Sequence, residues 1–295
     1  MQRYFNRWGW LLASPYLLFT FVFFLIPLIW GIWLSTQSWD LISPEREFVG
    51  LQNFAAALQD ERVRAAALTP FKFMLIFIPV TLASALIIAM VINSAKRFQG
   101  ALAIAFFLPY LASGVAAALV VRGILDNFGP FNTFLRSAFG GAGPDWLGNP
   151  VLAVVVISLM MAWKFSGYDA LIFLAGLQSI PVELYEAANL DGANAWTKFW
   201  RITLPMLYPS LYTVIILSIG AMFSVFTEPF LLTNGGPELA TQTWTLEIYY
   251  QLFTSLNAGY ASAVALLNAV CVFAAVFVVR RVMEWWGGRN GWGEA

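Results

Sequence analysis

Three ionisable side chains interrupt the apolar stretches of this sequence: Lys164, Asp169 and Glu228. A charge inside a lipid bilayer is costly, so each of them is a candidate for a functional role. Lys164 and Asp169 are five residues apart, a rotation of about 140° on an ideal helix, so the two do not share a face. Either Gly167 breaks the helix and brings them together, or each one pairs with a neighbouring helix or with backbone.

The residue types that are missing exclude most enzyme chemistry. The sequence has no histidine and a single cysteine, Cys271. This excludes His-ligated haem or zinc, a Ser–His triad, an intrachain disulfide and a Cys cluster. The phosphate-binding pattern GxxxxGK(S/T) is also missing. Basic and acidic residues balance at 16 each, so nothing indicates a nucleic-acid partner. We expect no catalytic residue, metal site or cofactor in this chain, and an integral-membrane enzyme is disfavoured.

The composition indicates a membrane protein. Hydrophobic residues make up 60% of the 295 residues, charged residues 11%, and the mean hydropathy is +0.73. A soluble domain averages about 25% charged residues. Because a span needs about 20 apolar residues, the charge-poor stretches predict an all-α protein with a single domain, residues 1–295, and six transmembrane helices. The predicted spans cover residues 10–34, 73–92, 101–121, 151–177, 207–232 and 260–279, with a kink at Pro109.

The distribution of basic residues predicts the orientation of these spans. With the N-terminus inside, nine lysines and arginines lie in cytoplasmic segments: Arg3, Arg7, Lys96, Arg97, Lys198, Arg201, Arg280, Arg281 and Arg289. Five lie in the longer outside loops: Arg46, Arg62, Arg64, Arg122 and Arg136. Basic residues concentrate in cytoplasmic loops, so both termini are predicted to be cytoplasmic.

One long cytoplasmic segment, residues 181–205, joins the fourth and fifth spans. Pro181 and Glu183 suit a first helical turn, and Asp191-Gly192 marks a sharp break, after which a second short helix begins. Such a knob, fixed between two spans, can transmit force from a soluble partner into the membrane. The alternative is an interfacial amphipathic hairpin without a partner. Lys198 and Arg201 on its second helix can meet headgroups or a partner.

The same segment resembles the EAA motif of the membrane subunits of binding-protein-dependent ABC importers. The matching positions are Glu186, Ala187, Ala188, Asp191, Gly192 and Ala193, followed by Phe199, Ile202, Leu204 and Pro205. Four further stretches, in the same order along the chain, are similar to the carbohydrate branch of that family, the maltose and glycerol-phosphate type: residues 48–54, 174–181, 232–237 and 259–263. The extra N-terminal spans and the large insert of the larger maltose-type subunit are missing.

The resemblance implies a type I ABC importer permease fold and a prokaryotic inner membrane. It also implies four kinds of partner besides the lipid bilayer: a second permease subunit, two ATPase subunits, an extracytoplasmic solute-binding protein and the solute. ATP and Mg²⁺ would bind to the ATPase subunits, so this chain is not itself an enzyme. Residues 181–205 would be the coupling helix segment, with Glu186, Ala187, Ala188, Asp191, Gly192 and Ala193 as its mechanical residues.

A sugar or polyol is the solute that the resemblance favours. Sugars are held by aromatic faces and by hydrogen bonds to their hydroxyls. The candidate residues for the solute path are therefore Trp163, Lys164, Tyr168, Phe223, Phe226 and Glu228. Glu228 is expected either to bind a sugar hydroxyl or to pair across the subunit interface. Only Lys164 is a deep cation, which favours neutral solutes over glycerol phosphate. A secondary transporter that needs no ATP is the other alternative, but it leaves the EAA-like segment unexplained.

Overall fold

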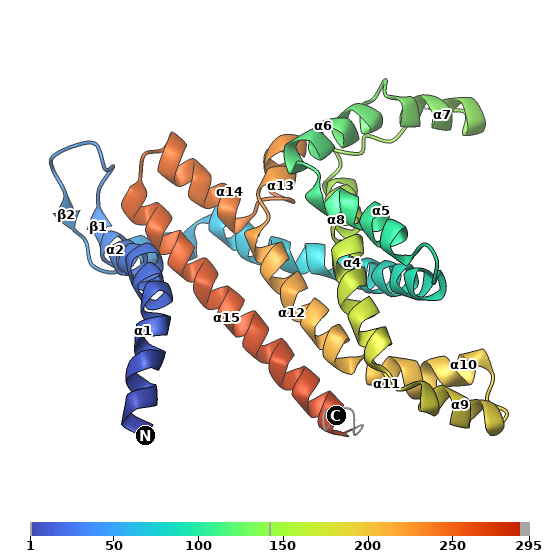
Figure 1. Ribbon diagram of the computed structural model, residues 1–295. Helices are drawn as coiled ribbons and strands as arrows, with labels where there is room; N and C mark the ends of the chain where they lie inside the picture. The colour runs from blue at the N-terminus through green and yellow to red at the C-terminus, as the bar shows by residue number, and fades with distance from the viewer. Residues whose placement is uncertain (1, 142, 290–295) are drawn as a thin grey trace. The chain divides into compact units, whose positions relative to one another are not determined.

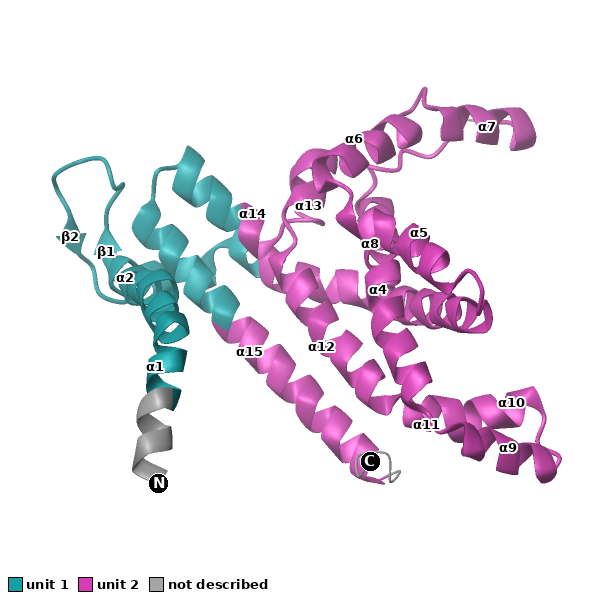
Figure 2. Ribbon diagram, in the orientation of Figure 1, with its two compact units in different colours: residues 1–64, 247–269 teal, residues 65–246, 270–295 magenta. Residues whose placement is uncertain are grey.

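The computed structural model describes residues 2–141 and 143–289, and the side chains from residue 9 onward. The single domain predicted from the sequence is divided into two compact units (Figure 2). Unit 1 comprises residues 1–64 and 247–269, and unit 2 comprises residues 65–246 and 270–295. The boundaries between the two units fall within three helices: the long helices α4 (Glu61–Ser94) and α15 (Ala258–Arg289) and the short helix α14 (Trp244–Tyr249).

Unit 1 begins with a long apolar helical run. Its elements are α1 (Gln2–Thr20), the π-helical turn η1 (Phe21–Leu25), α2 (Ile26–Leu34), β1 (Gln37–Ser38), β2 (Glu47–Phe48), α3 (Gln52–Gln59) and the π-helical turn η3 (Tyr250–Thr254). Residues 9–34 are long and apolar enough to cross a membrane, and only 6% of their most apolar window is buried by the rest of the chain. Helices this apolar and this uncovered suit a lipid environment.

A short antiparallel hairpin follows this run, with Gln37 opposite Phe48. The Asn53 side chain donates to the carbonyls of Ser35 (2.8 Å) and Gln37 (2.9 Å), which holds the hairpin against α3. In the loop of the hairpin, the N–H groups of Ser43 and Ile42 donate to the Asp40 carboxylate and lower its pKa.

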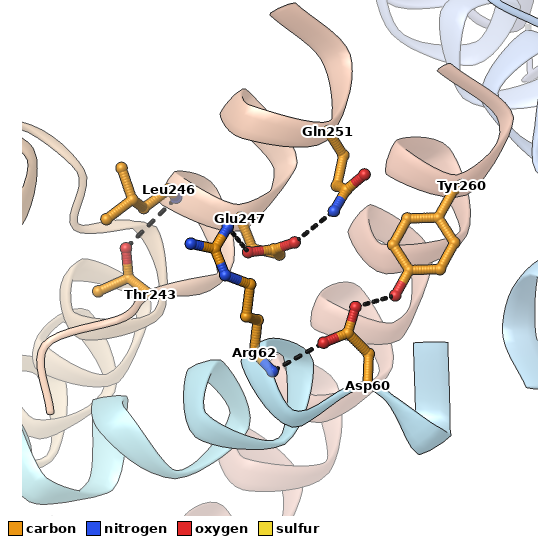
Figure 3. A network of polar contacts seen from close by, with 7 residues as sticks. All are labelled: Asp60, Arg62, Thr243, Leu246, Glu247, Gln251 and Tyr260. Carbon is orange, nitrogen blue, oxygen red and sulfur yellow. Dashed lines mark hydrogen bonds and ion pairs between the residues drawn. The ribbon is translucent and has the colours of Figure 1, made fainter. Parts of the chain in front are cut away.

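A polar network connects the α3–α4 junction with the later part of unit 1 (Figure 3). The Asp60 carboxylate accepts from the backbone N–H of Arg62 and from the hydroxyl of Tyr260, each at 2.8 Å. The buried Glu247 carboxylate lies 3.8 Å from the Arg62 guanidinium and accepts from the Gln251 amide at 2.7 Å. A buried carboxylate is tolerated when it is paired and hydrogen-bonded in this way.

Unit 2 is organised around α8 (Pro150–Ser179), of which 56% of the most apolar window is buried. The other elements are α5 (Gln99–Leu111), α6 (Gly114–Leu125), α7 (Pro130–Phe139), α9 (Val182–Leu190), α10 (Ala195–Lys198), η2 (Phe199–Thr203), α11 (Leu204–Met206), α12 (Tyr208–Ser224) and α13 (Thr227–Leu232) (Figure 1). The Asn149 side chain accepts from the N–H groups of Val151 and Leu152 and caps the first turn of α8. Two apolar clusters on α8 form the core, one shared with α4, α6 and α12 and the other with α4, α5 and α12.

Two helix pairs in the described chain bend sharply. Residues 99–111 and 114–139 meet at 84°, and residues 195–206 and 208–224 meet at 62°. The bend near Pro109 lies at Ala112 and Ser113, where α5 has already ended. Four helices of the described residues are long and apolar enough to span a membrane, or up to six if each bent pair is one span. The stretch predicted as one span over residues 207–232 is interrupted at Val225, which is extended, and continues as α13.

Gly167 does not break α8, which is helical throughout residues 150–179. The idea that a break there brings Lys164 and Asp169 together is therefore wrong. The glycine instead allows a close helix crossing, because a Cβ at this position would lie 1.8 Å from the carbonyl oxygen of Phe106 on α5. Small residues allow membrane helices to approach closely, as here.

We expect Gly167→Ala to destabilise the protein by about 1–3 kcal/mol, because α5 must move away from α8 to admit the methyl group. Gly220→Ala on α12 is the matched control, since nothing lies within 4 Å of a Cβ at that position. Thermal unfolding of both variants in detergent micelles is the measurement. Equal unfolding midpoints for the two variants would contradict the close crossing.

Candidate functional site

Lys164 and Glu228 form an ion pair between α8 and α13. The Lys164 ammonium lies 3.2 Å from a Glu228 carboxylate oxygen, and the two side chains are 17% and 4% exposed. The pair lies within unit 2, so Glu228 finds its partner inside this chain rather than across a subunit interface. Bringing two opposite charges together offsets much of the cost of burying each one. Asp169 lies buried on the same helix and does not belong to this pair.

The ion pair lies where interrupted helices meet the continuous α8. A Cβ on Gly114, the first residue of α6, would lie 3.1 Å from the Lys164 ammonium and 3.4 Å from the Glu228 carboxylate. The start of α6 follows the 84° bend, and α13 follows the break at Val225. Irregular backbone at membrane depth is tolerated where protein buries it or where it lines a cavity. Interrupted helices are also where transporters of other folds place their solute sites.

The aromatic side chains predicted for the solute path differ in their exposure and in their contacts. Tyr168 stacks on Tyr110, with ring centroids 4.7 Å apart and an angle of 18°. Phe223 is buried in the core with its ring edge-on to Phe71, so it offers no open face. Phe226 stacks on Phe230 at 5.1 Å.

Trp163 is about half exposed and borders a cavity of about 440 Å³ between α4, α5 and α8. The hydroxyls of Ser84 and Ser166, 2.6 Å apart, lie on the wall of the same cavity. The sequence reasoning did not select Tyr110, Gly114 or the two serines. Proline and glycine at positions 109 and 114 indicate a break between two apolar segments. This break could have identified Tyr110 and Gly114 as candidate site residues.

Residues 181–205 form a helix–turn–helix segment, as predicted. Gly192 has φ = +75°, a backbone conformation that favours glycine. Its N–H donates to the Asn189 carbonyl at 3.1 Å, and the N–H of Ala193 donates to the Ala188 carbonyl at 2.9 Å. The Asn194 side chain accepts from the N–H of Thr197 at 2.8 Å and caps the second helix.

Two side-chain hydrogen bonds hold the helices of this segment together. The Lys198 ammonium donates to the Asn189 side chain at 2.8 Å, and the hydroxyls of Tyr185 and Thr203 are 2.9 Å apart. The surface at the turn is exposed: Leu190 is 90% exposed, and Glu186, Ala187, Asp191 and Gly192 are among the other exposed residues there. Ala188 and Ala193 are half-buried. The two helices of the segment are thus held together by hydrogen bonds within the segment, and the residues at its turn are exposed.

Long apolar helices, two sharply bent helix pairs and a helix–turn–helix segment together give the described chain the architecture of an integral membrane protein. Residues 4–286 match the family described as "Binding-protein-dependent transport system inner membrane component", and the chain belongs to this family.

Relatives and solved structures agree with this assignment. The sn-glycerol-3-phosphate transport system permease protein UgpA of Agrobacterium fabrum is 32% identical over 93% of this chain and 94% of its own. The trehalose/maltose transport system permease protein MalF of Thermococcus litoralis is 30% identical over 93% of this chain and 92% of its own.

The fold matches a chain from the crystal structure of a bacterial ABC transporter involved in the import of the acidic polysaccharide alginate. The TM-score is 0.80 at 24% identity, over 96% of this chain and 99% of that one. A second structure of the alginate transporter, in complex with an alginate pentasaccharide-bound periplasmic protein, gives 0.79 at 23% identity, over 96% of each chain. The resemblance to importer permeases and the type I permease fold are confirmed.

We expect Glu228→Leu and Lys164→Met each to destabilise the protein by about 3–5 kcal/mol, because each leaves one buried charge without its partner. The double variant should recover most of this loss. Unfolding free energies in detergent micelles for the four proteins give the coupling between the two sites.

Arg280→Gln provides the control for this cycle. Arg280 pairs with Glu284 at 2.7 Å, but the side chains are 62% and 45% exposed. Its loss should cost no more than about 0.5 kcal/mol. Additive effects of the Lys164 and Glu228 variants would show that the two charges do not stabilise one another.

Proposed function

We propose that this permease carries a sugar or a related polyol, delivered by an extracytoplasmic binding protein, and works with a second permease subunit and two ATPase subunits. The observation that carries the proposal is the closed segment 181–205. Its turn at Gly192 exposes EAA-like residues to a partner, and an ATP-driven importer explains why such a segment lies between two spans. The trehalose/maltose permease MalF, a relative of this chain, supports a sugar as the solute.

ATP hydrolysis belongs to the separate subunits in this proposal. The sequence has no GxxxxGK(S/T) pattern, and no group of three metal-binding side chains occurs among the residues that the structure describes. Both termini lie in the cytoplasm and the chain crosses the inner membrane six times, with the fifth crossing beginning at α12, after segment 181–205. Glu186, Ala187, Ala188, Asp191, Gly192 and Ala193 then face the ATPase subunit.

The transport step follows from these connections. The binding protein docks on the outside loops, and ATP binding draws the two ATPase subunits together. Their movement displaces segment 181–205, and because that segment continues directly into α8 and α12, the spans tilt and open the path outward. Hydrolysis returns the path to the inward-facing form, and the solute leaves.

A neutral solute fits the path better than an anionic one. Lys164 is the only deep cation that the sequence offers, and Glu228 neutralises it at 3.2 Å. A phosphate or carboxylate ligand would have to compete with Glu228 for the ammonium. Trp163 and Tyr168 offer the aromatic faces that sugars use, whereas Phe223 is withdrawn into the core.

Purification from native membranes in mild detergent, followed by mass spectrometry, is the first test. An ATPase subunit and a second EAA-bearing permease should be recovered with this chain. If the chain is recovered alone and carries solute into liposomes without ATP, a secondary transporter takes the place of the importer.

We expect Gly192→Val to abolish ATP-driven solute uptake while leaving the protein in the membrane. The β-branched side chain does not adopt φ = +75° without strain, so the turn rearranges and the contact with the ATPase is lost. Gly192→Asn is the matched control, because asparagine tolerates this conformation, and it should retain most uptake. Normal uptake by a well-expressed Gly192→Val variant would rule out the coupling role.

A further inference from the structure

Two indole rings lie on the outer surface of the second helix of segment 181–205. Trp196 is 70% exposed and Trp200 is 49% exposed. They are one helical turn apart and touch edge to face, with ring centroids 5.5 Å apart. The segment does not need them for its own closure, which the Lys198–Asn189 and Tyr185–Thr203 hydrogen bonds provide.

These rings lie next to a membrane-crossing helix. Residues 195–206 run as one helix into Leu207, where the chain bends by 62° into α12. Trp200 lies seven residues before that bend and Trp196 eleven, or about 10 and 16 Å along the helix axis. A bend of 62° brings the helix closer to the plane of the bilayer than to the axis of the span. A helix that lies near the bilayer plane at the end of a span is in the position of an interfacial helix; α10, α11 and α12 are labelled in Figure 1.

The charges of segment 181–205 are separated between its two helices. The first helix carries Glu183 and Glu186 and is followed by Asp191, whereas the second carries Lys198 and Arg201. Arg201 is exposed and, within the described chain, makes no ion pair and no hydrogen bond through its side chain. Tryptophan and basic residues are typical of protein segments that lie in the headgroup region of a bilayer. The first helix is acidic, so anionic headgroups would repel it.

We propose that Trp196 and Trp200, here called the tryptophan face, lie at the bilayer surface among anionic phospholipid headgroups, and that Arg201, which follows Trp200 at the side of this face, binds the headgroups. The second helix is thereby anchored to the membrane, and the first helix and the turn stay free for a protein partner. This lipid contact goes beyond the proposed function. The argument for it depends on the continuity of the second helix with α12, and not on which protein docks at the turn.

Photocrosslinking in the purified importer complex tests the proposal directly. The complex is placed in nanodiscs of phosphatidylcholine with increasing phosphatidylglycerol, and p-benzoylphenylalanine replaces Trp196 in one variant and Leu190 in another. Leu190 lies at the turn and is 90% exposed. The probe at position 196 should form adducts with lipid, and their yield should rise with the fraction of phosphatidylglycerol.

The alternative results are distinct. An adduct between the probe at position 196 and a protein subunit, or no lipid adduct at that position, overturns the tryptophan face. A lipid yield that does not change with phosphatidylglycerol overturns its preference for anionic headgroups. The probe at position 190 reports on the proposed function alone, where an adduct with the ATPase subunit is expected.

Arg201→Gln in the Trp196 probe variant measures the charge contribution. Each basic residue near an anionic surface contributes about a fivefold gain in affinity, so half-maximal lipid crosslinking should need about fivefold more phosphatidylglycerol. Arg280→Gln is the matched control, because Arg280 is exposed but already paired with Glu284, and it should cause no shift. Equal titrations of the Arg201 and Arg280 variants would remove Arg201 from the headgroup contact.

Discussion

Hydrocarbon offers no hydrogen-bond partner to an open backbone, and this constraint determines where the helices of the permease can be broken. An unpaired backbone group in lipid costs several kcal/mol, so a break has to be covered by protein or to line a cavity. In unit 2 the breaks near Ser113 and Val225 lead into α6 and α13, the two short helices whose residues meet Lys164 on the buried α8. The largely buried α8 thus lies beside the interrupted backbone of this unit.

The low polarity of the surroundings also explains the Lys164–Glu228 pair. A short helix such as α13 has only six residues, too few to be stable by itself. A charge pair in a medium of low polarity is strong and has a specific direction, so it fixes α13 on α8 more selectively than apolar packing would. The cost is a cation that no longer serves a solute directly. In the proposed function, the pair shapes the solute path and keeps it neutral.

The sequence predicted the parts of the structure that depend on local signals. Apolar stretches located the long helices, Asp191-Gly192 located the turn, and the EAA-like residues identified the family. It could not show that Glu228 reaches back 64 residues to Lys164, since nothing local encodes such a pairing. It also left open whether Gly167 breaks α8, because a glycine that interrupts a helix and a glycine that lets a neighbouring helix approach cannot be told apart without the position of the Phe106 carbonyl. Phe223 was chosen as an aromatic platform, but whether a ring faces the core or a path is decided by packing.

Because α8 is continuous, it can tilt as one rigid rod. The helix has 30 residues, about 45 Å in length, and Lys164 lies close to its midpoint. Only Ile180 and Pro181 separate its end from the helix that leads to the Gly192 turn. With the ion pair as the fulcrum, a tilt of about 10° would displace the end at Ser179 by about 4 Å and the opposite end by a similar distance in the other direction. In the proposed function, a push by the ATPase subunit at the Ser179 end of α8 would produce an opposite movement at the Pro150 end, on the other side of the membrane.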